Sequence, residues 1–249
     1  MRIATYNVEW FANLFDDAGA LLDDGGWSGR QDVTREDQIA ALAQVFRAID
    51  ADAVMVIEAP DSSRHRDGAL ALANFAALAG IRAREVLIGY PNDTQQEIML
   101  LYDPDVMSAR HDPVGFETGK KGSRNPPRFD STFRIDLDID ATEDLITFSK
   151  PPLEAAIETA QGGFRMIGAH VKSKAPHGAR NRDDMMRLAI ANRRKQLAQC
   201  IWLRARVTHH LEEGDPLILA GDLNDGPGLD EFEELFGRSG VEVILGSDL

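Results

Sequence analysis

The chain has 249 residues, of which 43% are hydrophobic and 27% charged, and its net charge is −14. This composition predicts one soluble globule with a packed core over residues 1–249, and no apolar run reaches the roughly 20 residues that span a bilayer. The only cysteine, Cys200, excludes an intramolecular disulfide and reads as a small buried hydrophobe.

The first half of the chain predicts alternating strands and helices. A threonine with an acidic residue three positions on is a helix start, and an unbroken apolar run is typical of a strand buried on both faces. In chain order we expect a strand over 2–8, a loop over 11–32, a helix from Thr34, a strand over 53–57, a helix over 67–80 and a strand pair over 83–89 and 97–102.

The second half continues with strands at hairpin-like spacing. In chain order we expect a loop over 111–128, strands over 131–139, 145–149 and 164–172, a helix from Asn181 to about residue 207, a strand over 217–220 and a short helix over 229–236. This interleaving favours a mixed sheet-on-sheet core with outer helices over a purely parallel sheet.

The charge is unevenly distributed along the chain. A net charge of −14 disfavours nucleic acid as a partner, yet residues 172–206 carry ten Lys or Arg and two Asp, a net charge of +8. Residues 120–134 carry five basic residues and one acid, a net charge of +4. An acidic body with two basic segments suits a phosphate-bearing substrate that approaches one face; the alternative is solvated helix and loop faces.

Two polar residues end predicted strands. Glu58 follows the apolar run 53–57, where burying a carboxylate is costly unless a positive group meets it. A hard cation such as Mg²⁺ takes one or two carboxylates and keeps several waters, so Glu58 is a candidate ligand, or else an acid that reaches solvent. Asn7 ends the first strand and either forms a turn or helps to position a metal or a phosphate.

His170 lies in an apolar strand, where alternation would place Lys172 and Lys174 on the same face. A histidine beside two ammonium groups is a candidate phosphate site, because histidine supplies a hydrogen bond or a proton near neutral pH. The alternative is a structural imidazole whose hydrogen bonds are satisfied within the core.

Asp222 and Asn224 follow the predicted strand 217–220 in a Gly-Asp-Leu-Asn run. In near-extended backbone they face the same way, so that a carboxylate which orients or deprotonates water lies beside an amide that holds a phosphate. The alternative is that both residues simply make a turn next to Gly221.

Four segments together carry a resemblance to a known family. They are Tyr6–Trp10, Val56–Glu58, Gly168–Lys174 and Leu219–Asn224. From residue 2 to about residue 236 the chain resembles the endonuclease/exonuclease/phosphatase superfamily, which includes deoxyribonuclease I, abasic-site endonucleases, sphingomyelinases and inositol-phosphate phosphatases. The His-x-Lys-Ser-Lys run and the segment Lys150-Pro151-Pro152-Leu153-Glu154 look like its bacterial nuclease-like branch.

The resemblance implies a fold, a cofactor and residue roles. The fold is a four-layered α/β sandwich of two packed mixed sheets flanked by helices. The cofactor is Mg²⁺ or Mn²⁺ held by Glu58 with Asn7 nearby, and water attacks phosphorus in line, with His170, Asp222 and Asn224 around the scissile group. Lys172 and Lys174 would contact the substrate phosphate.

The resemblance also implies a motif that this sequence lacks. Members end in Ser-Asp-His on a late strand, whereas Ser247-Asp248 is followed here by Leu249. We therefore expect the chain to hold about the N-terminal three quarters of the usual domain and to leave a sheet edge unpaired, which favours dimerisation or aggregation.

Three functions remain open at this stage. The leading hypothesis is a metal-dependent phosphodiesterase whose partner is nucleic acid as substrate. The second is a catalytically impaired, phosphate-binding module of the same fold, and the third is a phosphatase or phospholipase that acts on a small-molecule or lipid phosphoester. Without a signal peptide in the sequence, we expect a cytoplasmic protein, or a secreted one if a leader has been removed.

Overall fold

A computed structural model describes residues 1–249 except 93, 95, 138–142, 227–236, 238 and 247–249. The chain forms two compact units, and each is described by itself. The first unit comprises residues 1–112, 149–169 and 218–221, and the second comprises 113–148, 170–217 and 222–249. The single domain over 1–249 that the sequence suggests stays a prediction.

The first unit is built on a mixed four-stranded sheet. Strands β1 and β2 run parallel, whereas β4 is antiparallel to both β2 and β3. Its order is β1-β2-β4-β3, with bounds Ile3–Asn7 for β1, Ala53–Ala59 for β2, Glu97–Tyr102 for β4 and Glu85–Ile88 for β3. The predicted pairing of the segments at 83–89 and 97–102 is confirmed.

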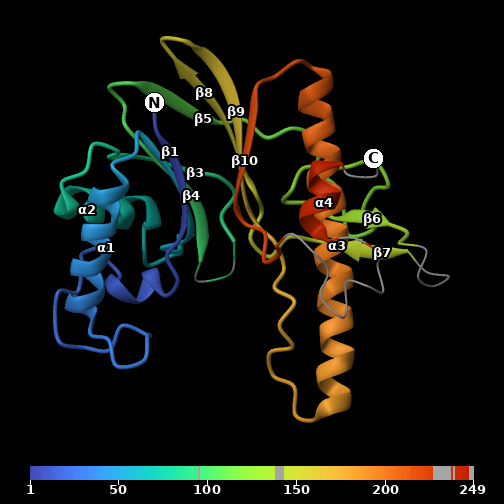
Figure 1. The fold of residues 1–249 in the computed structure, drawn as a ribbon, viewed down its shortest axis with the longest axis horizontal. Coiled ribbons are helices and arrows are strands. Elements are labelled where there is room, and N and C mark those ends of the chain that lie inside the picture. The colour runs from blue at the N-terminus through green and yellow to red at the C-terminus, as the bar shows by residue number, and fades with distance from the viewer. Residues whose placement is uncertain (93, 95, 138–142, 227–236, 238, 247–249) are drawn as a thin grey trace. The chain divides into compact units, whose positions relative to one another are not determined.

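Two helices cover one face of this sheet, as Figure 1 shows. They are α1 (Arg35–Ile49) and α2 (Gly68–Ala79), and a short 3-10 helix η1 (Phe11–Leu14) packs beside them. Thr34 caps α1 by accepting a hydrogen bond from the backbone N–H of Asp37, as the sequence predicts. Gly80 ends α2 in the left-handed conformation that glycine adopts without strain.

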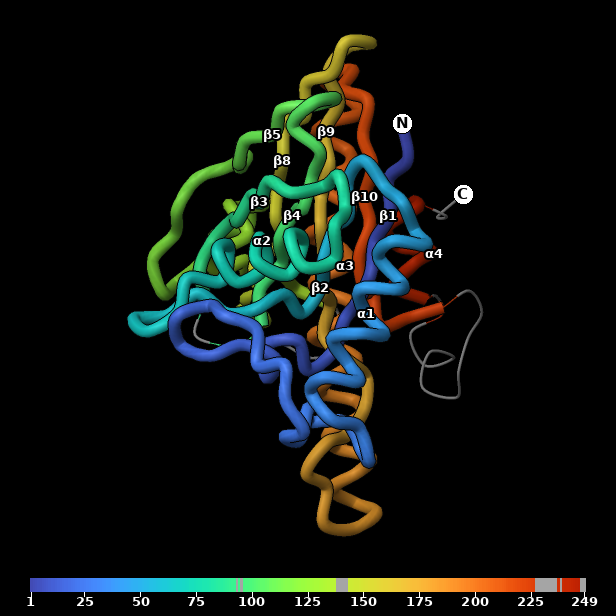
Figure 2. Tube along the Cα trace, turned by 90° about the vertical axis from the view of Figure 1, so that its left-hand side faces the viewer, coloured from blue at the N-terminus to red at the C-terminus, as the bar shows by residue number. Residues whose placement is uncertain are grey.

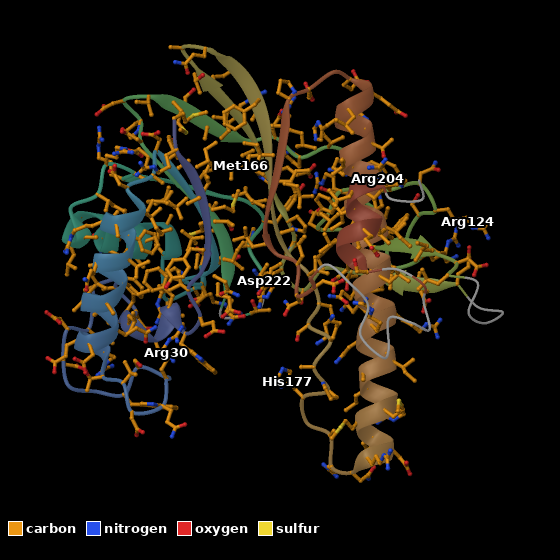
Figure 3. All side chains as sticks on the ribbon, in the orientation of Figure 1. Arg30, Arg124, Met166, His177, Arg204 and Asp222 are labelled. Atoms are coloured by element: carbon orange, nitrogen blue, oxygen red, sulfur yellow. The ribbon has the colours of Figure 1, made fainter. Side chains whose placement is uncertain are left out.

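The other face of the first sheet packs against a second four-stranded sheet. Buried Met55 and Leu100 meet Met166, which Figure 3 labels between the two sheets. Gly168 lies so close to Met55 that a Cβ would stand 2.3 Å from its sulfur, so a larger residue would require the Met55 side chain to shift. The first unit therefore supplies three layers of the expected sandwich: helices, sheet and sheet.

This second sheet has the order β10-β9-β8-β5. Its longest pair, the antiparallel strands β8 and β9, lies side by side in Figures 1 and 2. The bounds are Met107–His111 for β5, Leu153–Thr159 for β8, Gly162–His170 for β9 and Leu217–Asp222 for β10. Strand β10 stands at the end of the order, and its Ile218 is exposed.

The second unit is organised around one long helix, α3 (Arg182–Glu212), capped by Asn181 as predicted. A small antiparallel pair, β6 (Phe133–Ile135) and β7 (Asp144–Ile146), and the short helix α4 (Gly240–Leu245) pack beside it (Figure 1). The fully buried ring of Trp202 is its aromatic centre, in contact with Phe129, Phe133 and Phe148.

Several expected boundaries are wrong. Strand β9 ends at His170 rather than at 172, and α3 continues to Glu212 rather than to about 207. Strands β5 and β8 and helix α4 were not anticipated, because β5 and α4 are only 5 and 6 residues long and β8 is rich in Ala and Glu, which are uncommon in strands. The expected helix over 229–236, and Ser247 and Asp248, lie outside the described residues.

Two predictions about chain class can also be compared with the structure. The mixed sheets flanked by helices confirm the α/β class. In the described part of the chain no helix is both long and apolar enough for a membrane span. Cys200 is buried as expected, and burial raises the pKa of its thiol to about 12.

Candidate metal and phosphate residues

The candidate metal residues Asn7 and Glu58 end neighbouring parallel strands of the first unit. Asn7 is in register with Ile57, so both strand ends meet at the same edge of the sheet. Glu58 has a positive φ of 60°, and the pairing of β2 with β4 shifts between Ile57 and Ala59. This bulge breaks the strand alternation and leaves Glu58 half-buried between two fully buried residues.

A hydrogen-bonded chain that the sequence reasoning missed supports Glu58. The side-chain amide of Gln96 donates to Glu58 Oε2, and the ammonium group of Lys150 donates to Gln96 Oε1. Lys150 belongs to the Lys-Pro-Pro-Leu-Glu segment that the resemblance singles out, but nothing in the sequence marks Gln96. Such supporting groups fix the orientation of a carboxylate that binds a metal.

Donor chemistry at this edge fits a hard divalent cation. Glu58 offers a carboxylate, and Asn7 offers an amide oxygen, which also accepts the Glu9 backbone N–H at 3.2 Å. Among the residues that the structure describes, no group of three or more His, Cys, Asp or Glu side chains is arranged to hold a metal. Mg²⁺ is typically held by one or two carboxylates and several waters, so a single carboxylate with a neighbouring amide suits it.

In the second unit the structure brings His170 and Asp222 together. His170 Nε2 lies 3.8 Å from Asp222 Oδ2, and the two side chains are 10% and 29% exposed. The Val171 backbone N–H donates to the Asp222 carbonyl at 2.9 Å, which holds the two segments in register. His170 Nε2 and Asp222 Oδ2 are close enough for a charge interaction but too far apart for a hydrogen bond. An imidazole can donate or accept a proton near neutral pH.

The backbone between Asp222 and Asn224 is not extended, contrary to expectation. The φ of Asn224 is 50°, its backbone N–H donates to Asp222 Oδ1 at 2.8 Å, and its side-chain amide donates to the Val171 carbonyl at 2.9 Å. The run is therefore a turn locked by both side chains, and the prediction that both face one way along extended backbone is wrong.

The turn requires glycine at position 221. The φ of Gly221 is 138°, and a Cβ would lie 2.0 Å from the Ala169 carbonyl oxygen. Any side chain would push the turn away from the adjacent strand. Gly221 thus allows the chain to pass close to Ala169, which fixes the backbone position of Asp222.

Lys174, which we expected to contact the substrate phosphate, forms an ion pair with Asp225 in the structure. Its ammonium group lies 3.0 Å from Asp225 Oδ1, and Arg193 lies 3.3 Å from Asp225 Oδ2. The Asp225 side chain is fully buried and that of Arg193 is 2% exposed, so this is an ion pair inside the second unit. The sequence reasoning missed it, because Arg193 looks like one of several charges on a solvated helix.

Lys172 lies beside a second lysine that the sequence reasoning did not select. Its backbone N–H donates to Gln199 Oε1 at 2.8 Å, which fixes the loop after β9 to helix α3. Burial and the nearby charge of Lys172 lower the pKa of Lys195, which stands one helical turn before Gln199. Two neighbouring ammonium groups repel each other, and an anion between them relieves that repulsion.

Glu97 is a buried carboxyl beneath the loops next to Glu58. It is 1% exposed, and it accepts the Asn92 side-chain amide at 2.6 Å. Burial raises its pKa to about 7, against the lowering effect of hydrogen bonds from Asn92 and Ser62. The carboxyl therefore ties two loops to strand β4 and changes its protonation near neutral pH.

The predicted site residues thus form two groups, one in each unit. Asn7 and Glu58 lie at one sheet edge of the first unit. In the second unit His170 and Asp222 are the last residues of β9 and β10, and Asn224 lies in the turn after β10. Their roles, and those of Lys172 and Lys174, stay predictions.

Comparison with known proteins identifies the class. The described architecture is that of an α/β protein with mixed sheets and polar residues at the strand ends. A model of the Endonuclease/Exonuclease/phosphatase family matches residues 4–243, so the chain belongs to this family. That range includes all the predicted site residues. A comparison with curated proteins gives no match.

Solved structures with a similar fold include three proteins at 13–14% sequence identity. Truncated TDP2 from Caenorhabditis elegans is 14% identical, with 75% of this chain and 54% of that chain covered and a TM-score of 0.43. A β-hairpin deletion mutant of beta toxin from Staphylococcus aureus is 13% identical, with 94% and 71% covered and a TM-score of 0.48. ANGEL2, described as a 2',3'-cyclic phosphatase, is 13% identical, with 93% and 55% covered and a TM-score of 0.41.

This chain therefore spans about half the length of the TDP2 structure and of ANGEL2.

Proposed function

We propose that the chain is a divalent-metal-dependent phosphodiesterase that hydrolyses phosphodiester bonds of nucleic acid. The observation that carries this proposal is Glu58: a carboxylate at the end of a fully buried strand, placed by a bulge and oriented by Gln96 and Lys150. Membership of a family named for endonucleases, exonucleases and phosphatases supports phosphoester chemistry.

The metal residues in this proposal are Glu58 and Asn7, and the ion is Mg²⁺ or Mn²⁺. When bound, such a cation neutralises charge on the phosphate and on the leaving oxygen. Glu58 supplies the anionic ligand, while Gln96 and Lys150 hold it in one rotamer. Asn7 contributes its amide oxygen from the neighbouring strand end.

The residues proposed to act on the phosphate are His170, Asp222 and Asn224. His170 donates a hydrogen bond or a proton to the phosphoryl group, and Asp222 orients both the imidazole and the attacking water. The side chain of Asn224 is held by the Val171 carbonyl and presents its remaining polar positions to a phosphate oxygen. Lys172, with Lys195 beside it, supplies positive charge for the same phosphate.

Nucleic acid is favoured as the substrate class by the distribution of charge. Residues 172–206 have a net charge of +8 within a chain of net charge −14 and directly follow His170 in the sequence. Arg193 and Arg206 of this segment are buried, which leaves eight basic side chains to attract an anion. A polyanion is attracted by such a segment more strongly than a single phosphoester is.

A cleavage assay tests the proposed function. The protein should degrade an oligonucleotide in Mg²⁺ or Mn²⁺, should stop when EDTA is added, and should lose turnover in Glu58→Gln and in His170→Ala. A protein that binds metal while both variants cleave as fast as the wild type would refute the site. Parallel assays with a phosphoinositide and with sphingomyelin separate a nuclease from the small-molecule and lipid alternatives.

A further inference from the structure

The first unit contains a large cavity that the proposed residues do not line. It has a volume of about 1020 Å³ and is lined by residues of three segments: 12–35, 61–66, and a third with Pro91, Asn92 and Thr94. Its lining carries three arginines against two aspartates, although the chain as a whole is acidic. A cavity of this volume, lined by charged groups and by the aromatic ring of Trp27, suits a ligand the size of one or two nucleotides.

One half-buried arginine joins two of the cavity walls. Arg66 donates to the carbonyls of Ala12, Phe15 and Asp16 at 3.1 Å each, and it pairs with Asp61 at 2.7 Å. The guanidinium group thereby satisfies the carbonyls around the end of η1 and holds the loop after β2 against them. The cavity is preformed, and its walls need little ordering when a ligand binds.

An exposed tryptophan stands at the cavity. The Trp27 residue is 72% exposed, and its indole N–H donates to the Arg30 carbonyl at 2.8 Å. Arg30, labelled in Figure 3, reaches the carbonyl of Val8 at 3.2 Å and the carboxylate of Glu9 at 3.1 Å. The ring is therefore held in place by the segment just after Asn7 while most of it faces solvent. An exposed, oriented indole is a stacking surface for a planar ligand.

One arginine of the lining is available to an anion. Arg35 is bound through two hydrogen bonds to Asp24, and Arg66 is bound to Asp61. Arg64 is exposed, and within the described part of the chain it has no hydrogen bond or ion pair. A guanidinium group without a carboxylate partner binds a phosphate without first breaking an internal ion pair.

The third loop connects the cavity to the proposed metal residue. Asn92 and Thr94 line the cavity, and both hydrogen-bond to the Gln96 carbonyl, at 3.1 and 2.8 Å. The side chain of Gln96 in turn donates to Glu58. On the other side Asp61 lines the cavity three residues after Glu58 along the chain. Residues that line the cavity are thus joined through Gln96 to Glu58, the proposed metal ligand.

We infer that this cavity binds a nucleotide unit of single-stranded nucleic acid adjacent to the phosphodiester that is cleaved. Its base stacks on Trp27 and its phosphate contacts Arg64. The position of this nucleotide next to the cleaved phosphodiester rests on the proposed function, whereas binding of the nucleotide in the cavity does not depend on turnover. A single strand is the fitting form, because a base can reach a stacking surface only when it is unpaired.

Binding is measured first, without turnover. A short single-stranded DNA oligonucleotide is titrated in EDTA, with tryptophan fluorescence and anisotropy as readouts. Trp27→Ala should weaken binding about tenfold to a hundredfold, and Trp27→Phe should retain most of it while losing the fluorescence quench. Arg64→Ala should weaken binding and reduce the slope of log affinity against log salt by about 0.7, whereas Arg110→Ala, an exposed arginine outside the cavity, should change neither.

Turnover then separates this inference from the proposed function. The ratio of kcat/KM for the oligonucleotide to that for bis(p-nitrophenyl) phosphate should fall in Trp27→Ala and Arg64→Ala by the factor seen in binding. If oligonucleotide affinity is the same in wild type, Trp27→Ala and Arg64→Ala, the inference is overturned. If affinity depends on both residues but neither substrate is hydrolysed by the wild type, the cavity stands and the phosphodiesterase proposal fails.

Discussion

The two groups of site residues are built in opposite ways. In the first unit, Asn7 and Glu58 stand at the ends of apolar strands, and their positions follow from the parallel register of β1 and β2. In the second unit, His170 and Asp222 are the last residues of β9 and β10, and the segments that follow them are held by buried polar side chains of helix α3, namely Arg193, Gln196 and Gln199. The first is fixed by strand packing, and the second by a hydrogen-bonded network.

This difference has consequences for what each group tolerates. A strand end positioned by an apolar core keeps its backbone geometry when one supporting side chain is removed. A loop held by a buried ion pair loses its geometry when one partner is removed, because the other charge is left buried and unpaired. Mutations in the first unit should therefore act on metal affinity, and mutations in the second should act on stability as well as on chemistry.

The largest effect on the comparison is expected from His170→Ala. Removing a group that donates a proton or a hydrogen bond to the phosphate should lower kcat about 10²- to 10⁴-fold, with metal affinity unchanged. The exposed His209→Ala, on α3 in the same unit, is the matched control and should keep full activity. A wild-type kcat in His170→Ala would show that His170 takes no part in the reaction.

Asp225→Ala tests whether the loops depend on a buried network. Loss of this carboxylate leaves Arg193 without its buried charge partner and should lower the free energy of unfolding by about 3–5 kcal/mol. Urea denaturation measures this change, and the exposed Glu212→Ala should shift it by less than about 0.5 kcal/mol. Equal stability of the two variants would show that the loops hold without the ion pair.

Glu97 gives the first unit a dependence on pH. Its pKa is raised by burial from 4.5 to about 7, so the folded state binds this proton more tightly than the unfolded state does. The stabilisation is full below about pH 4.5 and is lost as the pH rises through about 7, a change of up to about 3 kcal/mol.

Unfolding of a metal-free sample at about pH 5 and about pH 8 measures this effect. Glu97→Gln should lose less stability than the wild type over that range, whereas Glu85→Gln, an exposed glutamate of the same sheet, should follow the wild type. The same change in the free energy of unfolding between the two pH values in all three proteins would refute the role of Glu97.

Gln96→Ala should give the smallest effect of the four. Because Gln96 only orients Glu58, its loss should weaken Mn²⁺ binding about 10- to 100-fold and leave the fold intact. Calorimetric titration measures the affinity, and the exposed Gln161→Ala serves as the control. Unchanged affinity would mean that the carboxylate needs no support from Gln96.

The sequence predicts the first unit better than the second for a physical reason. Unbroken apolar runs such as 53–57 can only be buried strands, so a polar residue at their end, here Glu58, is conspicuous. Gln96 escaped notice because nothing distinguishes a glutamine at a strand start from an ordinary surface residue. The bulge at Glu58 was equally invisible, since it depends on pairing with β4 rather than on local sequence.

In the second unit the apolar pattern is misleading. Helix α3 buries Arg193, Gln196, Gln199 and Arg206, residues that periodicity assigns to the solvent side. Strand alternation also placed Lys172 and Lys174 beside His170, although β9 ends at His170 and Lys174 turns to Asp225. Such contacts are made between distant parts of the chain, and no local pattern encodes them.

Mn²⁺ binding by Glu58→Gln, measured by calorimetry beside Glu85→Gln, tests the central claim most directly. The wild type and Glu85→Gln should bind the ion with the same affinity and cleave an oligonucleotide in its presence. Glu58→Gln should lose more affinity than the about 10- to 100-fold expected for a residue that only supports a ligand, and should lose cleavage with it. Equal Mn²⁺ affinity in both variants would contradict the assignment of Glu58 as the metal ligand.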